Sequence, residues 1–149
     1  MKKLMAVLTA SIALLAAGCA TTYTSADEGF GGYSEIRLAP DSYRVLIEGN
    51  GFTSRAEAEQ FAMRRCAELT LEQGKRYFIL ERHRAWVDRR YSDLGSSEFP
   101  KNEAIVTFVD EKSRDAFDAV TVIEETNKIA NGKLSSKAKH ALIDLTSNS

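Results

Sequence analysis

Cysteine and histidine, the residue types that most often act as nucleophiles, proton carriers or zinc ligands, are scarce in this chain. There are two cysteines and two histidines. His83 and His140 lie far apart, and neither has a Cys or His at the short spacing of a zinc site. The Gly-x-Ser-x-Gly and His-Glu-x-x-His patterns of hydrolases are absent. We therefore predict no metal, no cofactor and no enzymatic activity. A hydrolase that uses scattered carboxylates or His83 is the less favoured alternative.

The clearest chemical signal surrounds Cys19. Met1–Lys3 carries two positive charges, and Leu4–Ala17 is an apolar run broken only by two hydroxyl side chains. The run is shorter than the roughly 20 residues of a membrane-spanning helix, and its length is typical of a secretory leader. Small residues directly precede Cys19. These features predict a signal peptide over residues 1–18.

The stretch Leu15–Cys19 resembles the lipobox of bacterial lipoproteins, although Ala16 stands where that motif prefers Leu. In such proteins the leader is cut before the cysteine, whose sulfur receives a diacylglycerol and whose new amine is acylated. Because each buried acyl carbon contributes about 0.8 kcal/mol, several chains anchor a protein stably. The resemblance implies lipidation of Cys19. Ala20, in place of Asp, implies sorting to the outer membrane of a Gram-negative bacterium. We expect the periplasmic face, and exposure on the cell surface stays open. An ordinary signal peptide cleaved near Ala17 or Ala20 is the alternative.

The predicted mature chain, Cys19–Ser149, is long enough for one domain with a modest core. Without Lys2 and Lys3 it keeps 18 of the 20 basic side chains against 21 acidic ones, a formal charge of about −3. Nucleic-acid-binding domains normally carry a net basic face, so we expect no nucleic-acid partner. Cys66 has no cysteine to pair with once Cys19 is lipidated. We interpret it as a small core residue, with a reactive thiol as the alternative.

Ser54–Gly74 is predicted to form one long helix. Ser54 and Glu57 have the spacing of a capping box, and Gly74 stands where a left-handed C-terminal cap is expected. The apolar residues at helical spacing are Ala58, Phe61, Ala62, Cys66 and Leu69. The charged and polar residues expected to face away from this stripe are Glu57, Gln60, Arg64, Glu68 and Glu72.

Strand-like segments flank this helix. Alternating side chains predict strands over Tyr33–Leu38 and Tyr43–Glu48, which we expect to form a hairpin. Two further strands are expected at Tyr77–Val87 and Ala104–Asp110, with a loop over Ser92–Asn102. The last of these strands is apolar on both faces, which is typical of a central strand or of one covered on both sides.

The segments after the fourth strand favour helices. Asp115–Ile129 is ambiguous between helix and strand, and its length favours helix. Ser136–Leu145 has a clear helical repeat. The predicted fold is α+β: a mostly antiparallel four-stranded β-β-α-β-β sheet with one long helix and C-terminal helices packed on it. The helical crossover would bring the second and third strands parallel, with right-handed connectivity.

Residues 19–32 would be a flexible tether reaching about 40 Å, and residues 33–149 one globular domain.

A basic and aromatic cluster occupies the second half of the third predicted strand and the residues directly after it. Its members are Arg82, Arg84, Trp86, Arg89, Arg90 and Tyr91. Arginine and aromatic side chains favour contacts with an anionic polymer or a lipid headgroup. The simpler interpretation, which we prefer, is a charged strand that protects an exposed sheet edge.

The predicted domain resembles a group of small uncharacterised Gram-negative lipoproteins. The shared motifs are Gly-Tyr-Ser-Glu (Gly32–Glu35), Gly-Asn-Gly (Gly49–Gly51), Arg-Cys-Ala-Glu-Leu-Thr (Arg65–Thr70) and Ala-aromatic-Asp-Ala (Ala116–Ala119). The resemblance implies an α+β domain and a lipid anchor, but no activity. We expect a non-enzymatic envelope lipoprotein that contacts a partner protein or an envelope polymer. A module that binds small ligands or peptidoglycan is the alternative.

Overall fold

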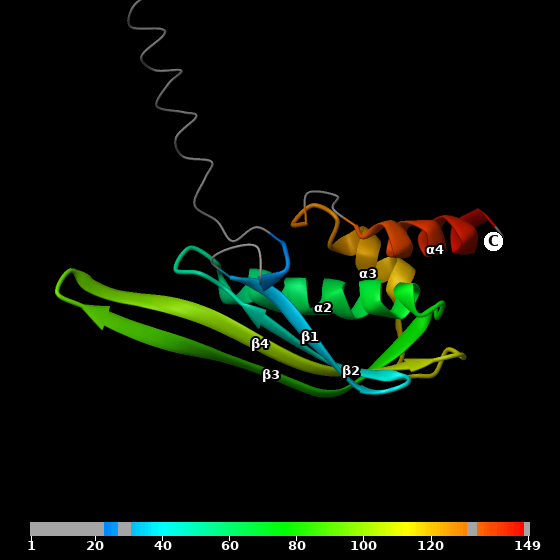
Figure 1. The fold of residues 1–149 in the computed structure, drawn as a ribbon, viewed down its shortest axis with the longest axis horizontal. Coiled ribbons are helices and arrows are strands. Elements are labelled where there is room, and N and C mark those ends of the chain that lie inside the picture. Colours follow the sequence, from blue (N-terminus) through cyan, green and yellow to red (C-terminus); the bar gives the residue numbers. More distant parts are fainter. Residues whose placement is uncertain (1–22, 27–30, 131–133, 148–149) are drawn as a thin grey trace, which may run out of the picture.

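The computed structural model describes residues 23–26, 31–130 and 134–147. The predicted signal peptide and Cys19 lie outside these residues. The elements in chain order are β1 (Gly32–Ala39), β2 (Ser42–Glu48), α2 (Arg55–Glu72), β3 (Tyr77–Ser92), β4 (Gly95–Val109), β5 (Phe117–Asp118), α3 (Ala119–Glu125) and α4 (Ser136–Ser147). The predicted α+β class is confirmed. All three labelled helices lie on one side of the sheet (Figure 1).

The sheet has five antiparallel strands in the order β1-β2-β4-β3-β5, so the predicted four-stranded arrangement is wrong. Both β2 and β3 pair antiparallel with β4, which places them in the same direction but not side by side. The apolar character of both faces of β4 did identify the central strand correctly. What the sequence did not reveal is that β4 inserts between the two strands that the helix connects.

The predicted loop over Ser92–Asn102 is also wrong, because β4 already begins at Gly95. Ser92 pairs with Gly95 across a two-residue turn, and the ladder continues without a break to Pro100 opposite Val87. Much of this part of the hairpin is exposed on both faces, so it lacks the alternation of apolar and polar residues that marks a half-buried strand.

Helix α2 begins and ends as predicted. The Ser54 hydroxyl accepts a hydrogen bond from the Glu57 amide at 3.1 Å, and the Glu57 carboxylate accepts one from the Ser54 amide at 2.8 Å. At the other end Gly74 adopts a φ of 72°, which favours glycine. The Lys75 amide then donates to the Thr70 carbonyl at 3.0 Å, which satisfies one of the last carbonyls of the helix.

Helix α2 is buried on two sides. The predicted apolar stripe lies in the core, as expected. However, Arg64 and Glu68, which were predicted to face away from it, are buried as well. The reason is a second layer: α3 and α4 both contact α2 on the side away from the sheet (Figure 1). A helix between two layers needs partners for its polar side chains as well as its apolar ones.

The ambiguous Asp115–Ile129 segment contains both kinds of structure. Phe117 and Asp118 form the short strand β5, paired with the start of β3, and the Phe117 ring stacks on the buried Phe78 at 5.3 Å. The Asp118 carboxylate then accepts a hydrogen bond from the Val120 amide at 3.0 Å, so α3 begins at Ala119 rather than Asp115. The last predicted helix is confirmed as α4.

Replacing Ser54 with Ala should lower the free energy of unfolding by about 1 kcal/mol, because the capping box loses its acceptor. Chemical denaturation followed by circular dichroism measures this change. Ser34→Ala, at an exposed position of β1, is the matched control and should leave stability unchanged. Equal stabilities for the two variants would contradict the assigned role of the cap.

Candidate functional site

The most prominent surface feature is an arm, defined here as Val87–Phe99, formed by the outer halves of β3 and β4. Pairing between β2 and β4 ends at Lys101, and β5 pairs only with the first two residues of β3. Among the described strands, those of the arm therefore pair only with each other. The arm projects well past the rest of the sheet (Figure 1). At its tip Leu94 is fully exposed and Tyr91 is 78% exposed.

The predicted basic and aromatic cluster lies on β3, but the strand divides it between two faces. Successive side chains of a strand point to opposite faces of the sheet. Trp86 is opposite Lys101 in the register, whereas its neighbours Ala85 and Val87 are opposite Asn102 and the buried Pro100 on the face that carries α2. The residues on the open face are Arg82, Arg84, Trp86 and Arg90; those on the α2 face are Arg89 and Tyr91. The six residues thus do not form one patch.

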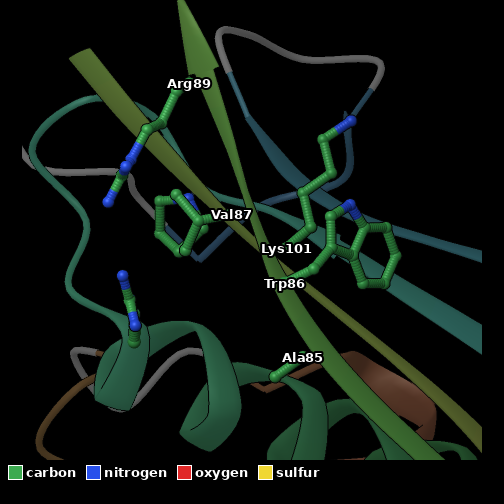
Figure 2. A pocket seen from close by; sticks show the side chains of 7 residues that line it. Ala85, Trp86, Val87, Arg89 and Lys101 are labelled. Atoms are coloured by element: carbon green, nitrogen blue, oxygen red, sulfur yellow. The ribbon is translucent and has the colours of Figure 1, made fainter. Parts of the chain in front are cut away.

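The base of the arm adjoins a cavity of about 470 Å³. The residues that line it are Arg55, Ala85, Trp86, Val87, Arg89, Pro100 and Lys101. Figure 2 shows Arg89 on one side of the strands and Trp86 and Lys101 on the other. Ala85, Val87 and Pro100 give the cavity an apolar floor on the α2 face. Of the predicted cluster, only Trp86 and Arg89 reach this cavity.

Two arginines on the cavity rim share one carboxylate. Arg89 donates to Glu98 through Nε at 3.0 Å and lies within 2.9 Å of it through Nη2. Arg55, the first residue of α2, reaches the other oxygen of Glu98 at 3.5 Å. The hydrogen bond from Arg89, followed by the charges of Arg89 and Arg55, lowers the pKa of Glu98. The rim therefore holds two positive charges against one negative charge.

Lys101 pairs with carboxylates other than that of Glu98. Its ammonium group lies 2.5 Å from Glu48 and 3.1 Å from Asp88, so two carboxylates already neutralise it. Of the three cationic residues lining the cavity, the two arginines provide the available positive charge. The sequence did not point to Arg55, because it is distant from Arg89 along the chain. It did not point to Glu98, because that residue lies in the segment that was predicted to be a loop.

The second notable group is a buried charged cluster that the sequence did not predict. The carboxylate of Glu68 accepts hydrogen bonds from the Tyr23 hydroxyl at 2.8 Å, Arg64 Nε at 3.1 Å and Arg65 Nη1 at 3.0 Å. Burial raises the pKa of Glu68, against the opposing effect of its hydrogen-bond donors. Arg65 also contacts Glu35 on β1 at 2.7 Å, which joins the helix to the sheet.

Tyr23 changes the interpretation of the predicted tether. The residue is 6% exposed. The centroid of its ring lies 5.4 Å from that of Phe61 and 5.1 Å from that of Tyr33. The Tyr33 amide donates to the Thr24 carbonyl at 2.9 Å. Tyr23–Ala26 therefore belongs to the folded body, which reaches further toward the N-terminus than the predicted start at Tyr33. The other residues of the predicted tether, apart from Gly31 and Gly32, lie outside the described ranges.

Cys66 lies in the core, fully buried, as the simpler interpretation predicted. Burial raises the pKa of its thiol to about 12, against the lowering effect of Arg65. A thiol in this state is a poor nucleophile at neutral pH. Within the described ranges no group of three or more His, Cys, Asp or Glu is arranged to hold a metal ion.

No family model, no curated protein and no solved structure that was compared matches this chain. The arguments on function therefore rest on its own residues. None of the helices in the part of the chain that the structure describes is both long and apolar enough to cross a membrane.

Tyr23→Phe should lower the free energy of unfolding by about 1.5–3 kcal/mol, because Glu68 loses a hydrogen bond to its buried carboxylate. Thermal denaturation of the purified protein measures the loss. Tyr91→Phe removes the same hydroxyl from an exposed ring and should have no effect. If both variants melt like the parent, the docking of Tyr23 on α2 is wrong.

Cys66 should resist alkylation by iodoacetamide at pH 8 in the folded protein, since its thiol is buried and protonated. Mass spectrometry of the tryptic peptide that contains Cys66 measures the modified fraction. The same protein in guanidinium chloride is the control and should react completely. Rapid modification without denaturant would favour the reactive-thiol alternative.

Proposed function

We propose that this protein is a non-enzymatic lipoprotein of the cell envelope, anchored through Cys19 to the periplasmic face of the outer membrane. Its domain acts by contact with a partner protein or an envelope polymer. The lipobox resemblance motivates the anchor. The observation that supports action by contact is the projecting arm, which presents long exposed strand edges and an exposed apolar tip.

The position of Tyr23 limits how far such a domain stands from the membrane. Tyr23 is the fourth residue after Cys19, and four residues span at most about 14 Å when fully extended. Because Tyr23 is packed into the body, the anchored domain lies against the lipid surface. The predicted reach of about 40 Å is therefore too large. In this arrangement the arm, not the tether, is the part that reaches other molecules.

The arm has the properties of a contact element. Its strands leave main-chain groups on their outer edges unpaired with other described strands, and such edges accept a strand from a partner. Leu94 and Tyr91 at the tip add apolar and aromatic area, which interfaces favour. Charged side chains along β3 also protect an edge from unspecific pairing, so contact at the tip is the more specific hypothesis.

The anchor is tested by growing cells with radiolabelled palmitate. The parent protein should incorporate label and fractionate with the outer membrane, whereas Cys19→Ser should do neither. Cys66→Ser is the matched control and should retain the label. Labelling of Cys19→Ser, or its unchanged membrane fractionation, would overturn the proposed anchor.

The contact is tested separately by placing a photo-crosslinking amino acid at Leu94 in cells. A discrete crosslinked product is expected there. The control position is Ile36, a similarly apolar and exposed residue on β1, away from the arm. The arm is not the contact element if Leu94 yields no product, or if both positions yield the same ones.

A further inference from the structure

We propose that the cavity at the base of the arm binds a small carboxylate ligand that carries an apolar group. The carboxylate would lie between the guanidinium groups of Arg55 and Arg89. The apolar group would lie on the floor formed by Ala85, Val87 and Pro100. This inference concerns a ligand site on the domain and does not depend on the proposed anchor or on the contact at the tip of the arm.

The rim already holds a carboxylate in this position, that of Glu98. It lies 3.0 Å from Arg89 Nε and 3.5 Å from Arg55 Nη2. The two arginines come from different elements, one from the first residue of α2 and one from the α2 face of β3. The fold thus brings together two planar donors that are suited to carboxylates. Glu98 occupies the place that a ligand carboxylate would take or share.

Competition with Glu98 is energetically feasible. The side chains of Arg55, Arg89 and Glu98 are 69%, 58% and 46% exposed. Ion pairs between exposed side chains contribute little, because water solvates the separated charges well. The three groups also leave one positive charge in excess. An incoming anion can therefore pair with this excess charge or displace Glu98 at small cost.

The floor determines the rest of the ligand. Pro100 is buried, and Val87 is half-buried beside it in the register. These side chains offer apolar surface but no charge. The volume of about 470 Å³ lies in the range of small-molecule sites, which combine apolar walls with a few polar groups that orient the ligand. A compact anion with one short apolar side chain matches both features.

The probe pair for the test is N-acetyl-leucine and N-acetyl-leucinamide, which differ only in the carboxylate. Each is titrated into isotope-labelled full-length protein, and amide chemical shifts are followed by NMR. The acid should shift the signals of Ala85 and Val87 in a saturable manner, and the neutral amide should bind at least about fivefold more weakly. Equal responses to the two probes, or no shift at these residues up to the solubility limit, would overturn the proposal.

Three variants sharpen the result. Glu98→Gln removes the competing negative charge and should tighten binding of the acid about fivefold. Arg89→Gln should weaken it by a similar factor. Arg84→Gln carries the same change on the open face of the same strand and should have no effect.

If the acid binds only through the general positive charge of the arm, Arg89→Gln and Arg84→Gln should weaken binding equally, and this result would overturn the proposal. Unchanged affinity in Glu98→Gln would show that the site between the arginines is not used. Since these side chains are exposed, the variants should remain folded, which the spectra themselves verify.

Discussion

The hydrogen bonds of Glu68 hold the layers of this domain together. A carboxylate with almost no exposure is stable only if every oxygen is paired, because an unpaired buried charge is very unfavourable. Here its donors come from two arginines of the same helix and from Tyr23, 45 residues earlier in the chain. Removing any one partner would leave a buried charge poorly compensated. These hydrogen bonds thus fix the position of the segment around Tyr23 relative to α2.

The cluster extends to the other layers through the arginines. Arg65 contacts Glu35 of β1 at 2.7 Å and Glu72 at 3.1 Å. Arg64 donates to the Ile123 carbonyl of α3 at 3.0 Å. A single turn of α2 therefore connects the sheet on one side with the helical layer on the other. Such buried ionic groups often add less to stability than apolar packing of similar volume would. We infer that here they favour this packing over others, because another packing would leave some of these charges unpaired.

The surfaces that we propose for contact and ligand binding lie away from this cluster, outside the tightly packed core. Beyond Lys101, toward its tip, the hairpin has no neighbouring strand among the described residues, and most of its side chains are exposed. Core packing therefore does not restrict the types of these residues, which can contact other molecules. The cavity forms where this arm leaves the body, next to the first residue of α2. The docked Tyr23 brings the same body close to the point of the proposed lipid anchor. The proposed anchor, the arm and the cavity are therefore separate features of the protein.

Local patterns in the sequence were sufficient for several elements. The capping box of Ser54 and Glu57, the glycine that ends α2, the central strand and the last helix each depend on residues within one or two turns or on one alternating run. Short-range rules of this kind determined the α+β class and the apolar stripe of α2. The sequence also identified the arginine and aromatic residues of β3, but not Arg55 and Glu98, which meet Arg89 only in the folded structure.

The sequence could not reveal which elements become neighbours. Arg64 and Glu68 have the pattern of a solvent-facing helix side, and only the covering helices and Tyr23 bury them. The arm escaped prediction because a solvated hairpin has no apolar alternation. The pairing of Arg55 with Glu98, 43 residues apart, exists only once the arm folds over the start of α2. Sequence by itself therefore determined several local elements and motivated the proposed localisation of the protein. Tertiary structure decided strand order, buried charge and cavity, because each depends on contacts between residues that the chain separates.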